Sequence, residues 1–146
     1  MSLLISHRVR FLIVGAHALA ALGRPRNTLD LDIFIEPTPR NANRFAEVAR
    51  AFGLGALAEA AGELATGARM TRIGNPPLRI DVMNHIDGVT FAEAWAGRRR
   101  ARIDELSVSF LGEAEFRRNK LASGRPKDLL DLALLDEGRV TTPRRR

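Results

Sequence analysis

Apolar and polar residues alternate along three short stretches of the chain, and this period of two predicts β-strands with one buried face. The clearest stretch is residues 29–36, where leucine and isoleucine occupy the odd positions and Asp30 and Asp32 lie between them. The pattern recurs at residues 78–83 and 106–110. These three stretches are therefore predicted to be half-buried strands.

Two further strands are predicted from composition and from the turns beside them. Residues 10–14 are mostly apolar and end at Gly15, which is typical of a buried strand that stops at a tight turn. Residues 70–73 precede the turn signal Gly-Asn-Pro-Pro at 74–77. We therefore expect residues 70–73 and 78–83 to form an antiparallel hairpin.

Helices are predicted where apolar residues recur every three to four positions or follow a capping signal. Thr38 can cap a helix that ends at Gly53, and Thr90 and Glu93 have the spacing of a capping box. Residues 54–66 are alanine-rich, and a weak helix and a loop insertion both fit them. The other predicted helices are residues 16–22, 113–122 and 127–137.

Length and composition indicate a single domain over residues 1–146. Of these residues 45% are hydrophobic and 27% charged, and no repeat or long linker divides the chain. The absence of cysteine excludes disulfides, thiolate zinc sites and cysteine nucleophiles. No apolar run approaches the ~20 residues of a membrane span, and residues 1–6 are too short for a signal peptide. We therefore expect a cytoplasmic protein with no membrane partner.

Positive charge is in excess, because 23 lysine and arginine residues face 17 acidic ones. A net charge of +6 favours polyanionic partners such as nucleic acid or nucleotide phosphates. Much of the charge falls in a run at Arg98, Arg99, Arg100 and Arg102 and in a basic tail at residues 139–146. A solvated surface is the alternative interpretation, since few aromatic residues are present to stack on bases.

Three aspartates provide the candidate chemistry. Asp30 and Asp32 share one face of the strand at 29–36, and Asp81 lies opposite the apolar face of the strand at 78–83. Clustered carboxylates raise one another's pKa, whereas bound Mg²⁺ accepts oxygen ligands and removes the conflict. Three such carboxylates can hold two divalent ions, as in polymerases. We predict that Asp30, Asp32 and Asp81 are catalytic metal ligands; a polar, half-solvated strand face is the alternative.

The spacing of these motifs resembles a known family. Val-Gly-Ala-His-Ala at 14–18, Arg-Pro-Arg-Asn-Thr at 24–28 and the Asp-Leu-Asp of the next strand look like the opening of the minimal nucleotidyltransferases of the DNA polymerase beta superfamily, closest to the AbiEii-like toxin branch. Residues 79–82 lie where such proteins carry a third carboxylate. The most specific part is residues 119–131, which resemble their distal lysine–aspartate helix segment.

The resemblance implies an α/β (α+β) fold, with a small mixed β-sheet flanked by helices and a helical C-terminal part at about residues 113–138. It implies that a nucleoside monophosphate moves from a nucleoside triphosphate onto a hydroxyl of RNA or protein, with two Mg²⁺ or Mn²⁺ ions as cofactors. Asp30 and Asp32 would bind both ions, and Asp81 would complete the second site and accept the hydroxyl proton. Toxin activity, restrained by an antitoxin protein, is a further implication.

The turn at Gly15 is predicted to bind phosphate through main-chain amides. Glycine lets the triphosphate approach the backbone, and a helix that begins there presents unpaired N–H groups. The family usually pairs this glycine with serine or a second glycine, whereas this chain carries Ala16. A phosphate-binding hydroxyl is therefore missing, and Ala16 contributes only its amide.

Three cations near the C-terminus complete the predicted phosphate site. Lys120, Arg125 and Lys127 lie within eight positions and would converge over the carboxylates if the chain turns back between the last two helices. Asp128 would position these cations. The alternative is a set of exposed charges in which Lys127 and Asp131 form an i,i+4 pair.

Two other functional classes fit the same sequence. A catalytically silent domain of this fold could bind a partner protein, an interpretation that Ala16 favours. A basic RNA-binding module could use the arginine run and the tail. Binding of a divalent ion separates the enzyme from both, because neither alternative requires one.

Overall fold

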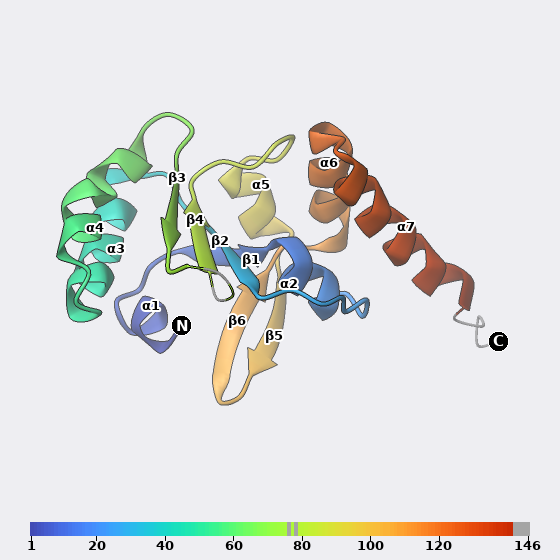
Figure 1. Ribbon diagram of the computed structural model, residues 1–146, viewed down its shortest axis with the longest axis horizontal. Coiled ribbons are helices and arrows are strands. Elements are labelled where there is room, and N and C mark those ends of the chain that lie inside the picture. Colours follow the sequence, from blue (N-terminus) through green and yellow to red (C-terminus); the bar gives the residue numbers. More distant parts are fainter. Residues whose placement is uncertain (76, 78, 142–146) are drawn as a thin grey trace.

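The computed structural model describes residues 1–75, 77 and 79–141, with the backbone alone for residues 138–141. Its strands form one six-stranded mixed sheet in the order β3-β4-β2-β1-β6-β5 (Figure 1). The strands are β1 (Phe11–Val14), β2 (Asp30–Ile35), β3 (Met70–Ile73), β4 (Arg79–Met83), β5 (Arg99–Ile103) and β6 (Leu106–Phe110).

Helices connect the strands along the chain. Those within the described residues are α1 (Ser2–Ser6), α2 (Gly15–Ala21), α3 (Pro39–Ala51), α4 (Gly55–Ala60), the 3₁₀-helix η1 (Ala61–Ala65), α5 (Phe91–Ala96), α6 (Glu113–Ser123) and α7 (Pro126–Thr141). None of these combines the length and apolar content that crossing a bilayer requires. The expected mixed sheet with flanking helices and a helical C-terminal part is confirmed.

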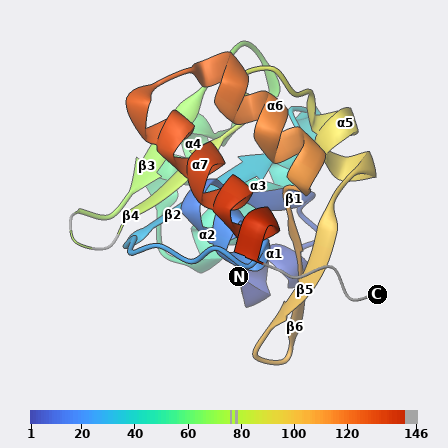
Figure 2. The ribbon, with the colours of Figure 1, turned by 90° about the vertical axis from the view of Figure 1, so that its right-hand side faces the viewer.

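The helices cover both faces of the sheet. In Figure 1, α1, α3 and α4 lie on one side, whereas α5, α6 and α7 lie on the other; Figure 2 shows α6 and α7 in front of the sheet. The central strand β1 is buried on both faces: Ile13 packs with Phe45 in one apolar cluster, and Leu12 packs with Phe116 in the other. Successive side chains of β1 point to opposite faces of the sheet, so this strand contributes to both apolar clusters.

Strand pairing fixes which side chains share a face. β2 is antiparallel to β1 and parallel to β4, while β6 is parallel to β1 and antiparallel to β5. The predicted hairpin is confirmed, because β3 pairs antiparallel with β4 and Ile73 lies opposite Ile80. Two residues assigned to its turn and second strand, Pro76 and Leu78, lie outside the described residues.

Both predicted capping signals begin helices. The Thr38 hydroxyl accepts a hydrogen bond from the Asn41 amide at 3.2 Å, and Thr90 and Glu93 cap one another's backbone amides. Residues 54–66 contain α4 and η1, which settles the choice that composition left open in favour of helix.

Of the two basic segments, one agrees with its interpretation and the other needs correction. Arg99, Arg100 and Arg102 lie on β5, an edge strand of the sheet, and their exposure agrees with the solvated-surface interpretation. The tail predicted at residues 139–146 begins later, because α7 continues through Thr141, and residues 142–146 lie outside the described residues. The sequence signal for the predicted end is Gly138, but α7 continues through this glycine.

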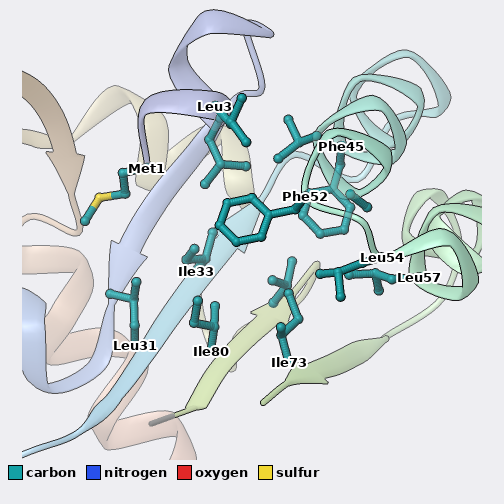
Figure 3. A pocket seen from close by; sticks show the side chains of 14 residues that line it. Met1, Leu3, Leu31, Ile33, Phe45, Phe52, Leu54, Leu57, Ile73 and Ile80 are labelled. Atoms are coloured by element: carbon teal, nitrogen blue, oxygen red, sulfur yellow. The ribbon is translucent and has the colours of Figure 1, made fainter.

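The face covered by α1 and α3 carries an apolar pocket of about 110 Å³ that is partly open to solvent (Figure 3). Leu31 and Ile33 reach it from β2, Ile80 from β4, and Phe52 from the end of α3. Every lining side chain is hydrophobic. The pocket therefore offers no side chain for acid–base or metal chemistry, and the aspartates that alternate with Leu31 lie on the opposite face.

Candidate functional site

A cleft of about 440 Å³ lies on the sheet face that α6 and α7 cover. Side chains of β2, β3 and β4, the turn between β1 and α2, and the end of α6 line it. It brings together six of the nine residues predicted from the sequence: Gly15, Asp32, Asp81, Lys120, Arg125 and Lys127. Of the other three, Asp30 lines a neighbouring hollow, whereas Ala16 and Asp128 are buried.

Asp32 and Asp81 are neighbours at the floor of the cleft. They are register partners in the parallel pair of β2 and β4. Partners in a parallel pair project from the same face, and the pleat places Asp30 on that face too. The expectation that all three carboxylates share one side of the sheet is confirmed.

Asp32 is the carboxylate without a counterion. It forms no hydrogen bond or ion pair with any described residue. Burial raises the pKa of its carboxyl, and the negative charges of Asp81 and Asp30 raise that pKa further. Lys120 and Lys127 act in the opposite direction through their positive charges, without offsetting the rise. Ionised Asp32 is therefore electrostatically unfavourable in the folded protein.

Asp81 is held by Arg72 from the adjacent strand. Arg72 lies opposite Asp81 in the antiparallel pair of β3 and β4. Its Nε donates to Asp81 Oδ1 at 2.8 Å, and its Nη2 donates to Oδ2 at 3.3 Å. The Asp81 side chain is 11% exposed and that of Arg72 is 46% exposed. A solvent-facing guanidinium therefore neutralises a largely buried carboxylate.

Asp30 is held in the same way by Arg79, its register partner on β4. The Arg79 Nε and Nη2 donate to the two Asp30 oxygens at 3.2 and 2.9 Å, and this hydrogen bonding lowers the pKa of Asp30. Across residues 1–75, 77 and 79–141 no three acidic or histidine side chains are grouped closely enough to hold a metal ion. In this arrangement both oxygens of Asp30 are hydrogen-bonded to Arg79.

Gly15 makes room for Asp32. The residue has a φ of +68°, a region that glycine adopts without strain. A Cβ atom built on it would collide with Oδ2 of Asp32. The glycine at the end of β1 therefore allows a close approach between the turn and the carboxylate, in addition to leaving the turn open to the cleft.

A buried ion cluster joins α6 to α7. Lys120 Nζ lies 3.2 Å from Asp128 Oδ1 and 3.3 Å from Asp131 Oδ2, and Arg26 Nε donates to Asp131 at 2.8 Å. The side chains of Lys120 and both aspartates are less than a tenth exposed. The i,i+4 pair suggested for Lys127 and Asp131 is wrong, because Asp131 turns inward to this cluster.

The predicted chain reversal occurs at Gly124, whose φ is +62°. Arg125 follows it and donates to Asp128 at 2.8 Å, while Lys127 is exposed and forms no ion pair with the described residues. Although burial alone raises the pKa of Asp128, hydrogen bonds from Arg125 and Lys120 lower it overall. The three cations thus differ in their partners. Lys120 pairs with Asp128 and Asp131, Arg125 pairs with Asp128 alone, and Lys127 pairs with no described residue, so its charge can bind a ligand.

The sequence did not single out several residues that line the cleft. Arg72 is the most prominent, and its position in a predicted hairpin opposite an aspartate-bearing strand was the available signal. At the rim, the Ser123 hydroxyl donates to Asp87 at 3.0 Å, and His85 lies 3.5 Å from the same carboxylate. Arg72 lies on β3, Ser123 on α6, and His85 and Asp87 on the loop after β4, so no single local motif marks the group.

Comparisons with models of known protein families and with curated proteins find no match to this chain. The functional argument therefore depends on the cleft itself: two neighbouring carboxylates, a glycine turn against one of them, and cations across from both.

Proposed function

We propose that this protein is a metal-dependent nucleotidyltransferase, which moves a nucleoside monophosphate from a nucleoside triphosphate onto a hydroxyl of RNA or protein. The observation that carries the proposal is the pair of Asp32 and Asp81, register partners at the floor of a cleft that cations also line. Carboxylates on one side and cations on the other suit a substrate that brings both divalent ions and phosphates.

The donor set of the cleft fits a divalent cation. Asp32 bears a charge that burial and neighbouring carboxylates disfavour, and a bound cation removes that cost. Asp32 and Asp81 would hold one ion, and Asp30 would contribute to a second after leaving Arg79. When bound, such ions neutralise charge on the leaving pyrophosphate and lower the pKa of the attacking hydroxyl.

The proposed reaction is an in-line displacement at the α-phosphorus. The acceptor hydroxyl oxygen bonds to that phosphorus, the bond to the oxygen bridging the α- and β-phosphates breaks, and pyrophosphate leaves. The hydroxyl proton passes to the Asp81 carboxylate. Lys127 and Arg125 would contact phosphate oxygens, and the backbone at the Gly15 turn would face the same charge.

Transfer of label tests this proposal. The protein is incubated with Mg²⁺, a cell extract and each of the four ribonucleoside triphosphates in turn, labelled at the α-phosphate, and RNA is then separated from protein. We expect label in one of the two fractions, which identifies the acceptor class, and no label in chelator or with the D32N/D81N variant. Absence of label from both fractions with all four nucleotides would overturn the proposal in favour of a silent scaffold.

A further inference from the structure

Arg72 and Arg79 occupy the positions of cations at two of the three strand carboxylates. Each guanidinium reaches both oxygens of its aspartate, Asp81 for Arg72 and Asp30 for Arg79, at distances between 2.8 and 3.3 Å. A divalent ion prefers the same oxygen atoms. An ion at Asp81 therefore competes directly with Arg72.

The two arginines differ in what surrounds them. Arg72 lies on β3, an edge strand, and Arg79 on β4, an internal strand (Figure 1). Arg72 lines the cleft together with Arg125 and Lys127, whereas Arg79 lines a separate hollow. The Arg72 side chain is 46% exposed and that of Arg79 is 27% exposed. Arg72 is thus the guanidinium that can leave its aspartate and remain in the cleft.

Charge and shape both favour a phosphate as the second partner of Arg72. A cation that arrives at Asp32 and Asp81 repels the guanidinium that held Asp81. The planar guanidinium of arginine can form two parallel hydrogen bonds with a phosphate as well as with a carboxylate. The Nε and Nη2 of Arg72, which now donate to Asp81, could therefore donate to a phosphate instead.

We propose that Arg72 exchanges partners during substrate binding: a divalent ion displaces it from Asp81, and its guanidinium then binds the polyphosphate of the nucleotide in the cleft. This inference rests on the proposed function and assigns a further binding residue to it. Before the ion arrives, Arg72 keeps a largely buried carboxylate paired. Afterwards it joins Arg125 and Lys127 around the phosphates.

Two binding measurements on the whole chain test the exchange. The first titrates Mn²⁺ without nucleotide and detects free Mn²⁺ by electron paramagnetic resonance; the second titrates the Mn²⁺ complex of inorganic tripolyphosphate at saturating Mn²⁺. Because solvent screens the half-exposed Arg72 guanidinium, its removal in R72A is expected to tighten Mn²⁺ binding by only about three- to fivefold relative to the wild type. Loss of a charge-assisted bidentate contact should weaken tripolyphosphate binding about tenfold.

The matched control is R100A, an exposed arginine on β5, the other edge strand, outside the cleft lining. It should leave both affinities unchanged. Lysine retains the charge without the fork, so R72K should shift both affinities in the same directions by less, and it replaces R72A if circular dichroism shows R72A unfolded.

The outcomes separate the two proposals. Suppose that the wild type binds both Mn²⁺ and tripolyphosphate. If R72A then binds Mn²⁺ no more tightly than the wild type does, the exchange is overturned, while the proposed function is not contradicted. Unchanged tripolyphosphate affinity in R72A likewise overturns the phosphate contact. A wild-type protein that binds neither probe contradicts the proposed function itself, and the inference falls with it.

Discussion

Gly15 and Asp32 are in such close approach that a Cβ atom on the glycine would collide with the Oδ2 of the aspartate. This contact joins the turn after β1 to a carboxylate of β2, two features that are separate in the sequence. A substitution at Gly15 therefore also acts on Asp32, the carboxylate that we propose as a metal ligand, so a loss of function there does not test phosphate approach alone.

The Gly15→Ala variant should lose divalent-ion affinity and activity, because Asp32 must move to admit the methyl group. The change also places a side chain at positive φ, which by itself costs about 1–2 kcal/mol. Gly23→Ala is the matched control, since Gly23 also has positive φ, at +91°, but its Cβ would meet no atom within 4 Å. Thermal unfolding and Mn²⁺ titration of both variants check the prediction; equal Mn²⁺ affinity in the two would contradict it.

The Asp32→Asn variant should be more stable than the wild type in the absence of divalent ions, by about 1 kcal/mol or less. The folded-state pKa of Asp32 is raised, so its ionisation costs stability as pH rises from the ordinary value of 3.8 through the folded-state pKa. The gain from asparagine is therefore present at neutral pH and disappears below the ordinary value. Urea unfolding at a series of pH values measures it.

Asp30→Asn is the control for that experiment, because the pKa of Asp30 is shifted in the opposite direction. The hydrogen bond from Arg79 lowers the folded-state pKa of Asp30. Ionised Asp30 therefore stabilises the fold above the ordinary pKa of 3.8, and this stabilisation is lost as the pH falls through the folded-state pKa. We expect Asp30→Asn to be neutral or less stable at neutral pH. A stabilising Asp30→Asn together with a destabilising Asp32→Asn would refute this electrostatic description of the cleft.

Lys120→Met should destabilise the fold by about 3–5 kcal/mol, because it leaves Asp128 and Asp131 buried with one cation fewer. Lys127→Ala, on the exposed start of α7, should change the free energy of unfolding by less than about 0.5 kcal/mol. Urea denaturation compares the two. A Lys120→Met variant as stable as Lys127→Ala would mean that the buried cluster contributes little to holding α6 against α7.

Lys127→Ala should instead weaken nucleotide binding, more strongly at low salt than at high salt, as screening predicts for a phosphate contact. Isothermal titration with a nucleoside triphosphate at two salt concentrations measures the effect, with Arg100→Ala as the control. If Lys127→Ala and Arg100→Ala give the same salt dependence, the charge of Lys127 belongs to the solvated surface.

The strict period of two along β2 and β4 made the faces of the carboxylates predictable. Leu31 and Ile80 must reach an apolar core, so Asp32 and Asp81 must face the other way. Hydrophobic pattern alone therefore placed both aspartates on the correct side of a sheet whose strand order was unknown.

The register of β3 against β4 could not be predicted from the sequence, and this register decides which residue pairs with Asp81. A turn confined to residues 74–77 would place Arg72 opposite Arg79, whereas the observed pairing of Ile73 with Ile80 places it opposite Asp81. The cluster around Lys120 was hidden for a related reason. Its two aspartates lie on α7, and its second cation, Arg26, lies more than 90 positions before Lys120, so only tertiary packing brings them together.

The most direct test of the central claim compares two labels in one nucleotide. The purified protein, with Mg²⁺ and the acceptor fraction, receives a nucleoside triphosphate labelled at either the α- or the γ-phosphate. Nucleotidyl transfer predicts acceptor labelling from the α-phosphate alone, release of γ-label as pyrophosphate, and loss of both signals in Asp32→Asn. Acceptor labelling from the γ-phosphate, or undiminished transfer by Asp32→Asn, would contradict the account.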